Sequence, residues 1–343
     1  MPFCLPRLCT HVDARALKTA GDPFPVAEQV DYLPGSIQGQ FSVSQTGVLA
    51  FNSGGGSLKS QITWFDRGGR AIGAVGPPSV MQAPAISPDG TTVVVDRLDE
   101  ASGTYALWLY DLVHQTGSRF TFDPSNHMFP LWSPDGSSIL FASNRTGKFG
   151  LYEKAASGAE QEKLLFEADG ETLPTDWSPR FVLLSHVAVK TGIDLWSLPM
   201  AGNAKAAPVL RTRFAENHGK LSPDGRWLAY DSDESGQPEV YVQTFPGAEG
   251  KWQVSTKGGA RPVWSRSGRE LFYISADNNL TAVDVESGAR FEHGVPRPLF
   301  DVHMPPTATY DVSRDGTRFL ILKGIDPEVA APMTVVVNSL RRE

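Results

Sequence analysis

Residues 131–143 read LWSPDGSSILFAS: a short apolar segment, a Ser-Pro-Asp-Gly turn and a β-branched and aromatic run. Each turn residue has a physical reason. Proline presets φ for a turn, aspartate can bond nearby backbone amides, and glycine accepts positive φ. The apolar run at 139–141 is typical of a buried strand. The stretch therefore predicts a tight β-hairpin.

This turn signal recurs along the chain at nearly even spacing. Its copies begin at Ser44, Ser87, Ser133, Ser178, Ser222, Ser265 and Ser313. A period of about 45 residues fits four-stranded propeller blades and differs from the shorter leucine-rich, ankyrin and tetratricopeptide units. We therefore predict an all-β fold, a β-propeller of four-stranded antiparallel blades.

The number of blades depends on how the ring closes. Seven hairpins, with a strand at about 24–30 completing the last blade beside 333–337, predict seven blades. A six-bladed ring and an incomplete fragment of a larger ring are the alternatives. Because no linker interrupts the repeat, we predict one propeller domain over 21–343 after an irregular leader at 1–20.

Large aromatic residues share one position in five of the repeats. They follow their serines by 18 to 21 residues, on the predicted third strands, and are Trp64, Trp108, Tyr152, Trp196 and Tyr241. A single sheet with two apolar faces is not stable alone, so blades must pack face to face. We predict that these side chains fill the space between blades.

Composition excludes several classes of function. The net charge of −7 argues against a nucleic-acid or anionic-membrane surface, which needs clustered lysine and arginine. No stretch reaches the roughly 18 apolar residues that span a bilayer, and residues 1–15 lack the continuous apolar core of a signal peptide. Cys4 and Cys9 are the only cysteines and make a poor zinc site. Localisation is therefore not assigned from composition.

Two sets of motifs resemble known families. The segments 132–136 (WSPDG), 141–147 (FASNRTG) and 151–152 (LY) resemble the repeat of TolB-like propellers. The segments 21–28 (GDPFPVAE), 63–69 (TWFDRGG) and 334–338 (TVVVN) resemble the propeller region that follows the kinase domain in bacterial receptor-like Ser/Thr kinases. This resemblance implies an extracytoplasmic sensory or protein-binding propeller, with a protein, peptide or cell-envelope ligand as its partner.

No catalytic motif accompanies the repeats. The kinase loops, the Gly-x-Ser-x-Gly elbow and the His-Glu-x-x-His zinc signature are all absent from the sequence. We therefore predict a non-catalytic binding or sensory module without a cofactor or a bound metal.

The rival hypothesis is a channel-mouth glycosidase, lyase or sugar-binding propeller. Polar residues two to six positions before the repeat serines converge on one end of a propeller ring. The candidate ligand-binding residues there are Gln82, His127, Asp176, Glu216, His218 and Arg261. Two imidazoles with a carboxylate could hold a divalent metal, although their offsets from the serines differ. The acidic segments at Asp96 with Asp99-Glu100 and at Asp231 with Asp233-Glu234 are interpreted as solvated faces, with recognition of a basic partner as the alternative.

Overall fold

The computed structural model describes residues 2–5, 8–13, 18–25, 41–44, 48–52, 59–159, 161–188, 191–202, 205–247, 249–288, 290–305, 307–325 and 333–336. Two compact units divide the chain. One combines Met1–Lys59 with Ile325–Glu343, and the other, Ser60–Gly324, is the propeller. None of the described residues forms a helix with the length and apolarity that a membrane span requires. The predicted boundary after residue 20 stays a prediction.

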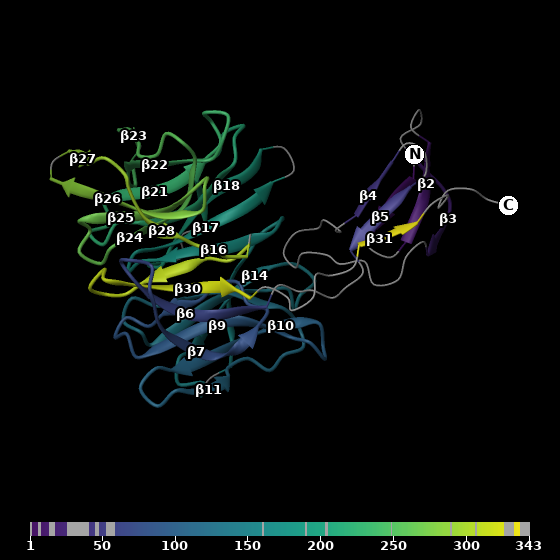
Figure 1. Ribbon diagram of the computed structural model, residues 1–343, viewed down its shortest axis with the longest axis horizontal. Helices are drawn as coiled ribbons and strands as arrows, with labels where there is room; N and C mark the ends of the chain where they lie inside the picture. Colours follow the sequence, from purple (N-terminus) through teal and green to yellow (C-terminus); the bar gives the residue numbers. More distant parts are fainter. Residues whose placement is uncertain are drawn as a thin grey trace. The chain divides into compact units, whose positions relative to one another are not determined.

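Five blades of the propeller are each built from consecutive antiparallel strands (Figure 1). The first contains β8 (Ala85–Ile86), β9 (Thr92–Asp99), β10 (Thr104–Asp111) and β11 (Thr116–Arg119). The second contains β12 (His127–Trp132), β13 (Ser138–Ser143), β14 (Gly150–Ala155) and β15 (Lys163–Glu167). The third contains β16 (Thr172–Trp177), β17 (Phe181–Ala188), β18 (Gly192–Pro199) and β19 (Ala207–Leu210).

The fourth and fifth blades continue the pattern. The fourth contains β20 (Glu216–Leu221), β21 (Trp227–Ser232), β22 (Glu239–Thr244) and β23 (Lys251–Gln253). The fifth contains β24 (Gly259–Trp264), β25 (Glu270–Ser275) and β26 (Asn279–Ser287), and both β27 (Phe291–His293) and β28 (Arg297–Asp301) pair with β26. In every blade the innermost strand ends at the repeat turn. We call the two ends of the ring the start end, where innermost strands begin, and the turn end.

The sixth blade joins segments from opposite ends of the propeller sequence. Its order is β29 (Tyr310–Val312), β30 (Arg318–Gly324), β6 (Ser60–Asp66) and β7 (Ala71–Ser79). Strands β30 and β6 pair along their whole length, from Arg318↔Asp66 to Gly324↔Ser60. Figure 1 shows β30, in yellow, beside β6, in dark blue. The last repeat thus supplies the two inner strands and the first repeat supplies the two outer ones.

This closure overturns the predicted seven blades: the ring has six. The hairpin at Ser44 does form, between β4 (Phe41–Val43) and β5 (Leu49–Asn52), but β5 pairs with β31 (Met333–Val336) in the other compact unit. That unit also contains the sheet of β1 (Pro2–Leu5), β2 (Leu8–Asp13) and β3 (Lys18–Pro25). Residues 26–30 lie outside the described residues. The first repeat is therefore split, and only its second half enters the ring.

The repeat turns have the chemistry that the sequence predicts. In the second blade, Asp135 accepts hydrogen bonds from the Ser133 hydroxyl (2.6 Å) and from the Ser137 amide (3.0 Å). Gly136 has a φ of 76°, where a side chain would be strained. The amide of Ser133 donates to the Ser138 carbonyl (2.9 Å) and closes the hairpin.

The core lies between neighbouring blades. Ile62, Val93, Val95, Leu320 and Leu322 are fully buried in one cluster that joins the sixth blade to the first. The predicted aromatic residues all lie on third strands, namely β6, β10, β14, β18 and β22. Each blade thus depends on its neighbours for burial of its apolar faces, as expected of a propeller.

Candidate functional site

Two buried carboxylates organise the start end of the ring, where the candidate residues were predicted. Asp96 and Asp231 each lie nine residues after a repeat serine, on the second strand of a blade. Asp96 is fully buried and Asp231 is 7% exposed. The interpretation of both as solvated surface residues is therefore wrong. Their buried carboxylates bond backbone groups of the innermost strands, which sequence motifs did not reveal.

Asp96 joins the first blade to the second. Its Oδ1 accepts the amides of Gln82 (3.1 Å) and Ala83 (2.7 Å), and its Oδ2 accepts the amide of Phe129 in the next blade (3.2 Å). Burial raises the pKa of Asp96 to about 6, although these amide bonds oppose the shift. Gln82 itself is buried, and its Nε2 donates to the Tyr105 hydroxyl (3.2 Å). Gln82, a predicted ligand residue, is thus a buried residue whose backbone amide and side-chain nitrogen both donate hydrogen bonds within the first blade.

Asp231 makes the equivalent connection between the fourth and fifth blades. Its Oδ1 lies 2.7 Å from His218 Nδ1 and accepts the amide of Arg261 at 3.0 Å. His218 and Arg261 have φ values of 51° and 56°, in the left-handed region that non-glycine residues seldom adopt. Both lie where β20 and β24 bulge against their partner strands. The structure therefore brings these two predicted residues together on one carboxylate.

Asp176 performs a third inter-blade connection. Its Oδ2 accepts the amide of Leu221 in the fourth blade (2.8 Å). Asp311, at the same position in the sixth blade, likewise accepts the amide of Ile86 in the first (2.8 Å). Burial raises the pKa of both carboxyls, and the positive charge of Lys220 opposes the shift in each case. Of these two aspartates, the sequence analysis predicts a role only for Asp176.

Glu216 is also buried, with 2% of its surface exposed. One carboxylate oxygen accepts a hydrogen bond from the Thr212 hydroxyl. Burial raises the pKa of Glu216, and the negative charge of Asp194 in the third blade adds to the shift. Glu216 is therefore packed into the interior and is not presented to a ligand at the ring opening.

His127 is completely buried in the second blade. Arg145 Nη2 lies 3.1 Å from its Nε2, and the ring packs edge-on against Phe141 with centroids 5.3 Å apart. A guanidinium can only donate, so Nε2 accepts and the imidazole is neutral. Burial is the main cause that lowers the pKa of His127 to about 4. This histidine therefore packs inside the second blade, against Arg145 and Phe141.

We expect His127 to stay neutral in NMR titrations down to about pH 5, because its pKa is about 4. The exposed His114 is the internal control, since the Asp111 carboxylate raises its pKa. An unfolded His127 binds a proton below about pH 6.5 and the folded one does not, so falling pH destabilises the fold by up to about 3 kcal/mol. Denaturant midpoints at two pH values should show this loss in the wild type and not in His127→Phe. Titration of His127 near pH 6.5 would contradict the assignment.

Most of the candidate residues are therefore buried and make contacts within a blade or between neighbouring blades. Only His218 and Arg261 share a partner, whereas His127 and Glu216 are buried in separate blades. Among the described residues, no three histidine, cysteine or acidic side chains are grouped to hold a metal ion. His127 and Glu216 begin the innermost strands β12 and β20, as expected. Asp176 is the next-to-last residue of β16, so it lies at the turn end and not at the predicted start end.

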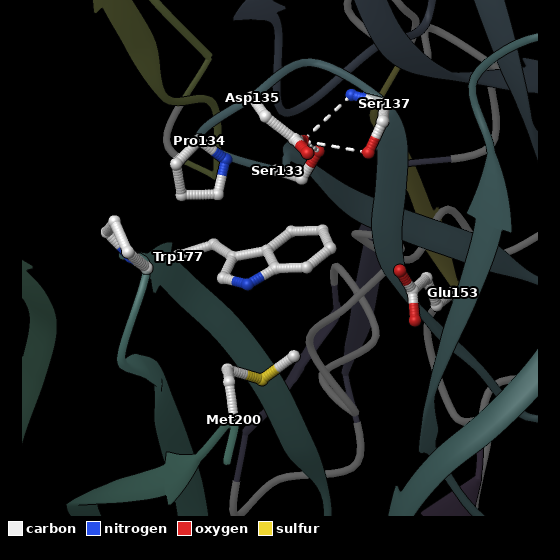
Figure 2. Close-up of a pocket in the computed structure, with 8 residues that line it drawn as sticks. Ser133, Pro134, Asp135, Ser137, Glu153, Trp177 and Met200 are labelled. Carbon is white, nitrogen blue, oxygen red and sulfur yellow. Dashed lines mark hydrogen bonds between the residues drawn. The ribbon is translucent and has the colours of Figure 1, made fainter.

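A cavity lies at the turn end, between the second and third blades. Its volume is about 500 Å³. Figure 2 shows the Trp177 indole between the turn at Pro134 and the side chain of Met200, with the Glu153 carboxylate on a neighbouring strand. The full lining is Ser133, Pro134, Asp135, Ser137, Glu153, Trp177, Pro179 and Met200. No motif in the sequence had indicated a pocket here.

Comparison with known proteins places this fold among the TolB-like propellers. Residues 57–193 match the TolB β-propeller domain family. A structure of putative TolB from Agrobacterium tumefaciens superposes with a TM-score of 0.63 at 19% identity, covering 79% of this chain and all of the other. The predicted resemblance to TolB-like propellers is thus confirmed in the family match over residues 57–193 and in the fold. The resemblance to a kinase-linked propeller stays a prediction.

Two relatives show how far sequence similarity reaches. The uncharacterized peptidase YuxL of Bacillus subtilis is 31% identical over 101 residues, which are 28% of this chain and only 15% of that protein. The uncharacterized protein Atu1656 of Agrobacterium fabrum is 24% identical over 241 residues, 66% of this chain and 76% of the relative. The similarity thus covers a small part of the peptidase and most of the uncharacterized protein.

Proposed function

We propose that this propeller is a non-catalytic module that binds a protein or peptide and serves as the extracytoplasmic sensory part of a kinase-linked system. The kinase link rests on the motifs at 21–28, 63–69 and 334–338. The binding role is supported by the TolB-like fold and by the structural use of the polar residues at the start end. Because those polar residues connect neighbouring blades, we assign the binding of a partner to the loops at the start end.

The observation that carries the proposal is the exposure of Phe122. This residue lies in the loop between β11 and β12, at the start end, and 71% of its surface is exposed. The guanidinium carbon of Arg119 lies 5.8 Å from its ring centroid, and the Lys154 ammonium lies 6.0 Å away. Aromatic residues and arginine are enriched in protein interfaces. An exposed aromatic ring near two cations suits a protein or peptide partner that covers the ring.

Site-specific photo-cross-linking tests this role. A benzophenone amino acid replacing Phe122 should give one discrete protein adduct in cells. Val113 is a matched control because it is 68% exposed in the same blade but lies in the β10–β11 hairpin at the turn end. An adduct at position 122 and none at 113 is the expected result. Absence of any adduct at 122, or equal labelling at both, would refute the proposed surface.

The rival enzyme hypothesis has a separate readout. The purified chain should not turn over oligogalacturonates, other glycosides or peptides, with or without divalent cations. Turnover that is lost in His218→Ala would overturn the non-catalytic assignment, because His218 is the predicted residue with the most accessible ring, 30% exposed. Thermal unfolding of that variant shows whether the fold has survived the substitution.

A further inference from the structure

The repeat turn of the third blade is shorter than the others. The amide of Ser178 donates to the carbonyl of Phe181, three residues along, whereas the amide of Ser133 donates to Ser138, five residues along. The turns at Ser87, Ser222, Ser265 and Ser313 all have the longer form. The sequence Ser178-Pro179-Arg180-Phe181 therefore lacks two residues, and with them the glycine of the turn.

The missing glycine exposes the turn of the preceding blade. In the complete turn of the second blade, a Cβ placed on Gly136 would lie 3.5 Å from Cδ of Pro88 in the previous blade. Gly268 has the same relation to Pro223, also at 3.5 Å. The third blade has no such glycine to cover Pro134. The cavity of about 500 Å³ opens beside this proline, and a volume of that size is typical of small-ligand sites.

An unpartnered indole forms one wall of the cavity. The equivalent tryptophans of other blades donate to the preceding blade: Trp132 to the Ala85 carbonyl and Trp264 to the Lys220 carbonyl, both at 3.1 Å. Within the described part of the chain, Trp177 makes no such bond. Trp177 is half-buried, and Met200 lies across its ring from Pro134 (Figure 2).

Two carboxylates give the cavity a negative charge. Asp135 accepts its turn hydrogen bonds through Oδ1, and these bonds lower the pKa of its carboxyl to about 2. Glu153 has no hydrogen bond or ion pair with any described residue. The neighbouring Lys154 and Arg180 make other contacts, and Lys163, the cross-strand partner of Glu153 on β15, forms no ion pair with it in the structure. Lys154 Nζ donates to the Phe120 carbonyl (2.9 Å), and the Arg180 guanidinium lies 5.6 Å from the centroid of the Phe181 ring.

We propose that this cavity binds an organic ammonium ion, whose charge is held by Glu153 and Asp135 and whose alkyl part lies on the Trp177 indole. A cation is attracted to the face of an indole, which is the best aromatic surface for this contact. The Met200 thioether and the two prolines offer an apolar surface for the alkyl part. An anion would meet two carboxylates, and a neutral alcohol would leave both uncompensated.

The indole N–H signal of Trp177 is a direct reporter of binding. The signal is assigned from its loss in Trp177→Phe. Millimolar n-butylammonium should shift it saturably, while n-butanol and butyrate should not. Removing one charge in Glu153→Gln should weaken the binding of n-butylammonium about fivefold, which corresponds to about 1 kcal/mol of binding free energy. Equal shifts with n-butanol, or unchanged affinity in Glu153→Gln, would overturn the proposal.

Two further variants separate binding from folding. Asp135→Asn and Asp89→Asn alter the same turn in adjacent blades, but only Asp135 lines the cavity. Weaker binding in the first and not the second is expected, and equal effects would contradict the site. Insertion of Asp-Gly after Pro179 restores the full turn and should abolish binding with unchanged or higher thermal stability. Retained binding in that variant would also refute the site.

The source of the ammonium group is distinguished by a blocked peptide. A terminally capped Gly-Lys-Gly peptide presents the same alkylammonium from a protein backbone. Binding of this peptide assigns the site to a lysine side chain of a partner, whereas binding of n-butylammonium alone assigns it to a free amine. Both results support an ammonium site, and failure of both probes overturns it. The result is independent of cross-linking at Phe122, which lies at the other end of the ring.

Discussion

Ile62→Asp should abolish cooperative unfolding of the propeller. Ile62 is fully buried on β6, where it pairs with Leu322 of β30 and with Val75 of β7. Truncation in Ile62→Ala should cost about 2–5 kcal/mol. The aspartate adds an unpaired charge in an apolar cluster, so its cost approaches the whole stability of an ordinary domain, about 5–15 kcal/mol. Denaturant unfolding with limited proteolysis would measure the loss.

The control for this experiment lies on the adjacent strand. Ile72 of β7 is 42% exposed, so Ile72→Asp introduces the same charge without burying it and should change stability by less than about 0.5 kcal/mol. If both variants unfold like the wild type, β6 does not close the ring. A disulfide between Gln61→Cys and Lys323→Cys, register partners on β6 and β30, checks the same point in a chain without Cys4 and Cys9.

Asp96→Ala should have the second largest effect, a loss of about 3–6 kcal/mol. The substitution leaves the amides of Gln82, Ala83 and Phe129 without their acceptor in a buried position. Since these amides belong to two blades, the cost combines lost hydrogen bonds with a loosened inter-blade contact. The stability of Asp96→Asn should lie between that of the wild type and that of Asp96→Ala. Its side-chain oxygen can still accept a hydrogen bond, whereas its amide nitrogen cannot. Equilibrium denaturation measures both variants.

Asp169→Ala serves as the comparison for Asp96. The Asp169 side chain is 99% exposed and pairs with Lys148, so its removal should scarcely change the unfolding midpoint. A small effect of Asp96→Ala, similar to that of Asp169→Ala, would show that the buried carboxylate does not hold the blades together. The same result would restore the interpretation of Asp96 as a surface residue.

The sequence predicted the local structure well because the hydrogen bonds that stabilise each turn are made by side chains of the turn itself. Pro134, Asp135 and Gly136 complete a bend without help from distant residues, so the sequence pattern sufficed. The blade number depends instead on which sheet accepts a strand. Spacing counts the hairpin at Ser44 as a blade. In the structure the outer strand β6 of that repeat pairs with β30, and its inner strand β5 pairs with β31.

The candidate site shows the same limit. The sequence placed His218 and Arg261 at the starts of innermost strands, but their shared acceptor, Asp231, comes from the second strand. Only the pairing register reveals that contact. The cavity at Trp177 arises from two absent residues, and its significance depends on how the neighbouring blades cover their prolines. A missing pair of residues carries no chemical signature of its own.

The closing blade has a consequence for synthesis on the ribosome. Strands β6 and β7 emerge before all other parts of the ring, whereas β30, the partner of β6, is the last strand of the ring to be made. During translation the apolar faces of the first and fifth blades lack the sixth blade that covers them in the clusters around Ile62 and Phe272. The nascent propeller therefore exposes two apolar surfaces until β30 is made, and we expect folding chaperones to bind it at that stage.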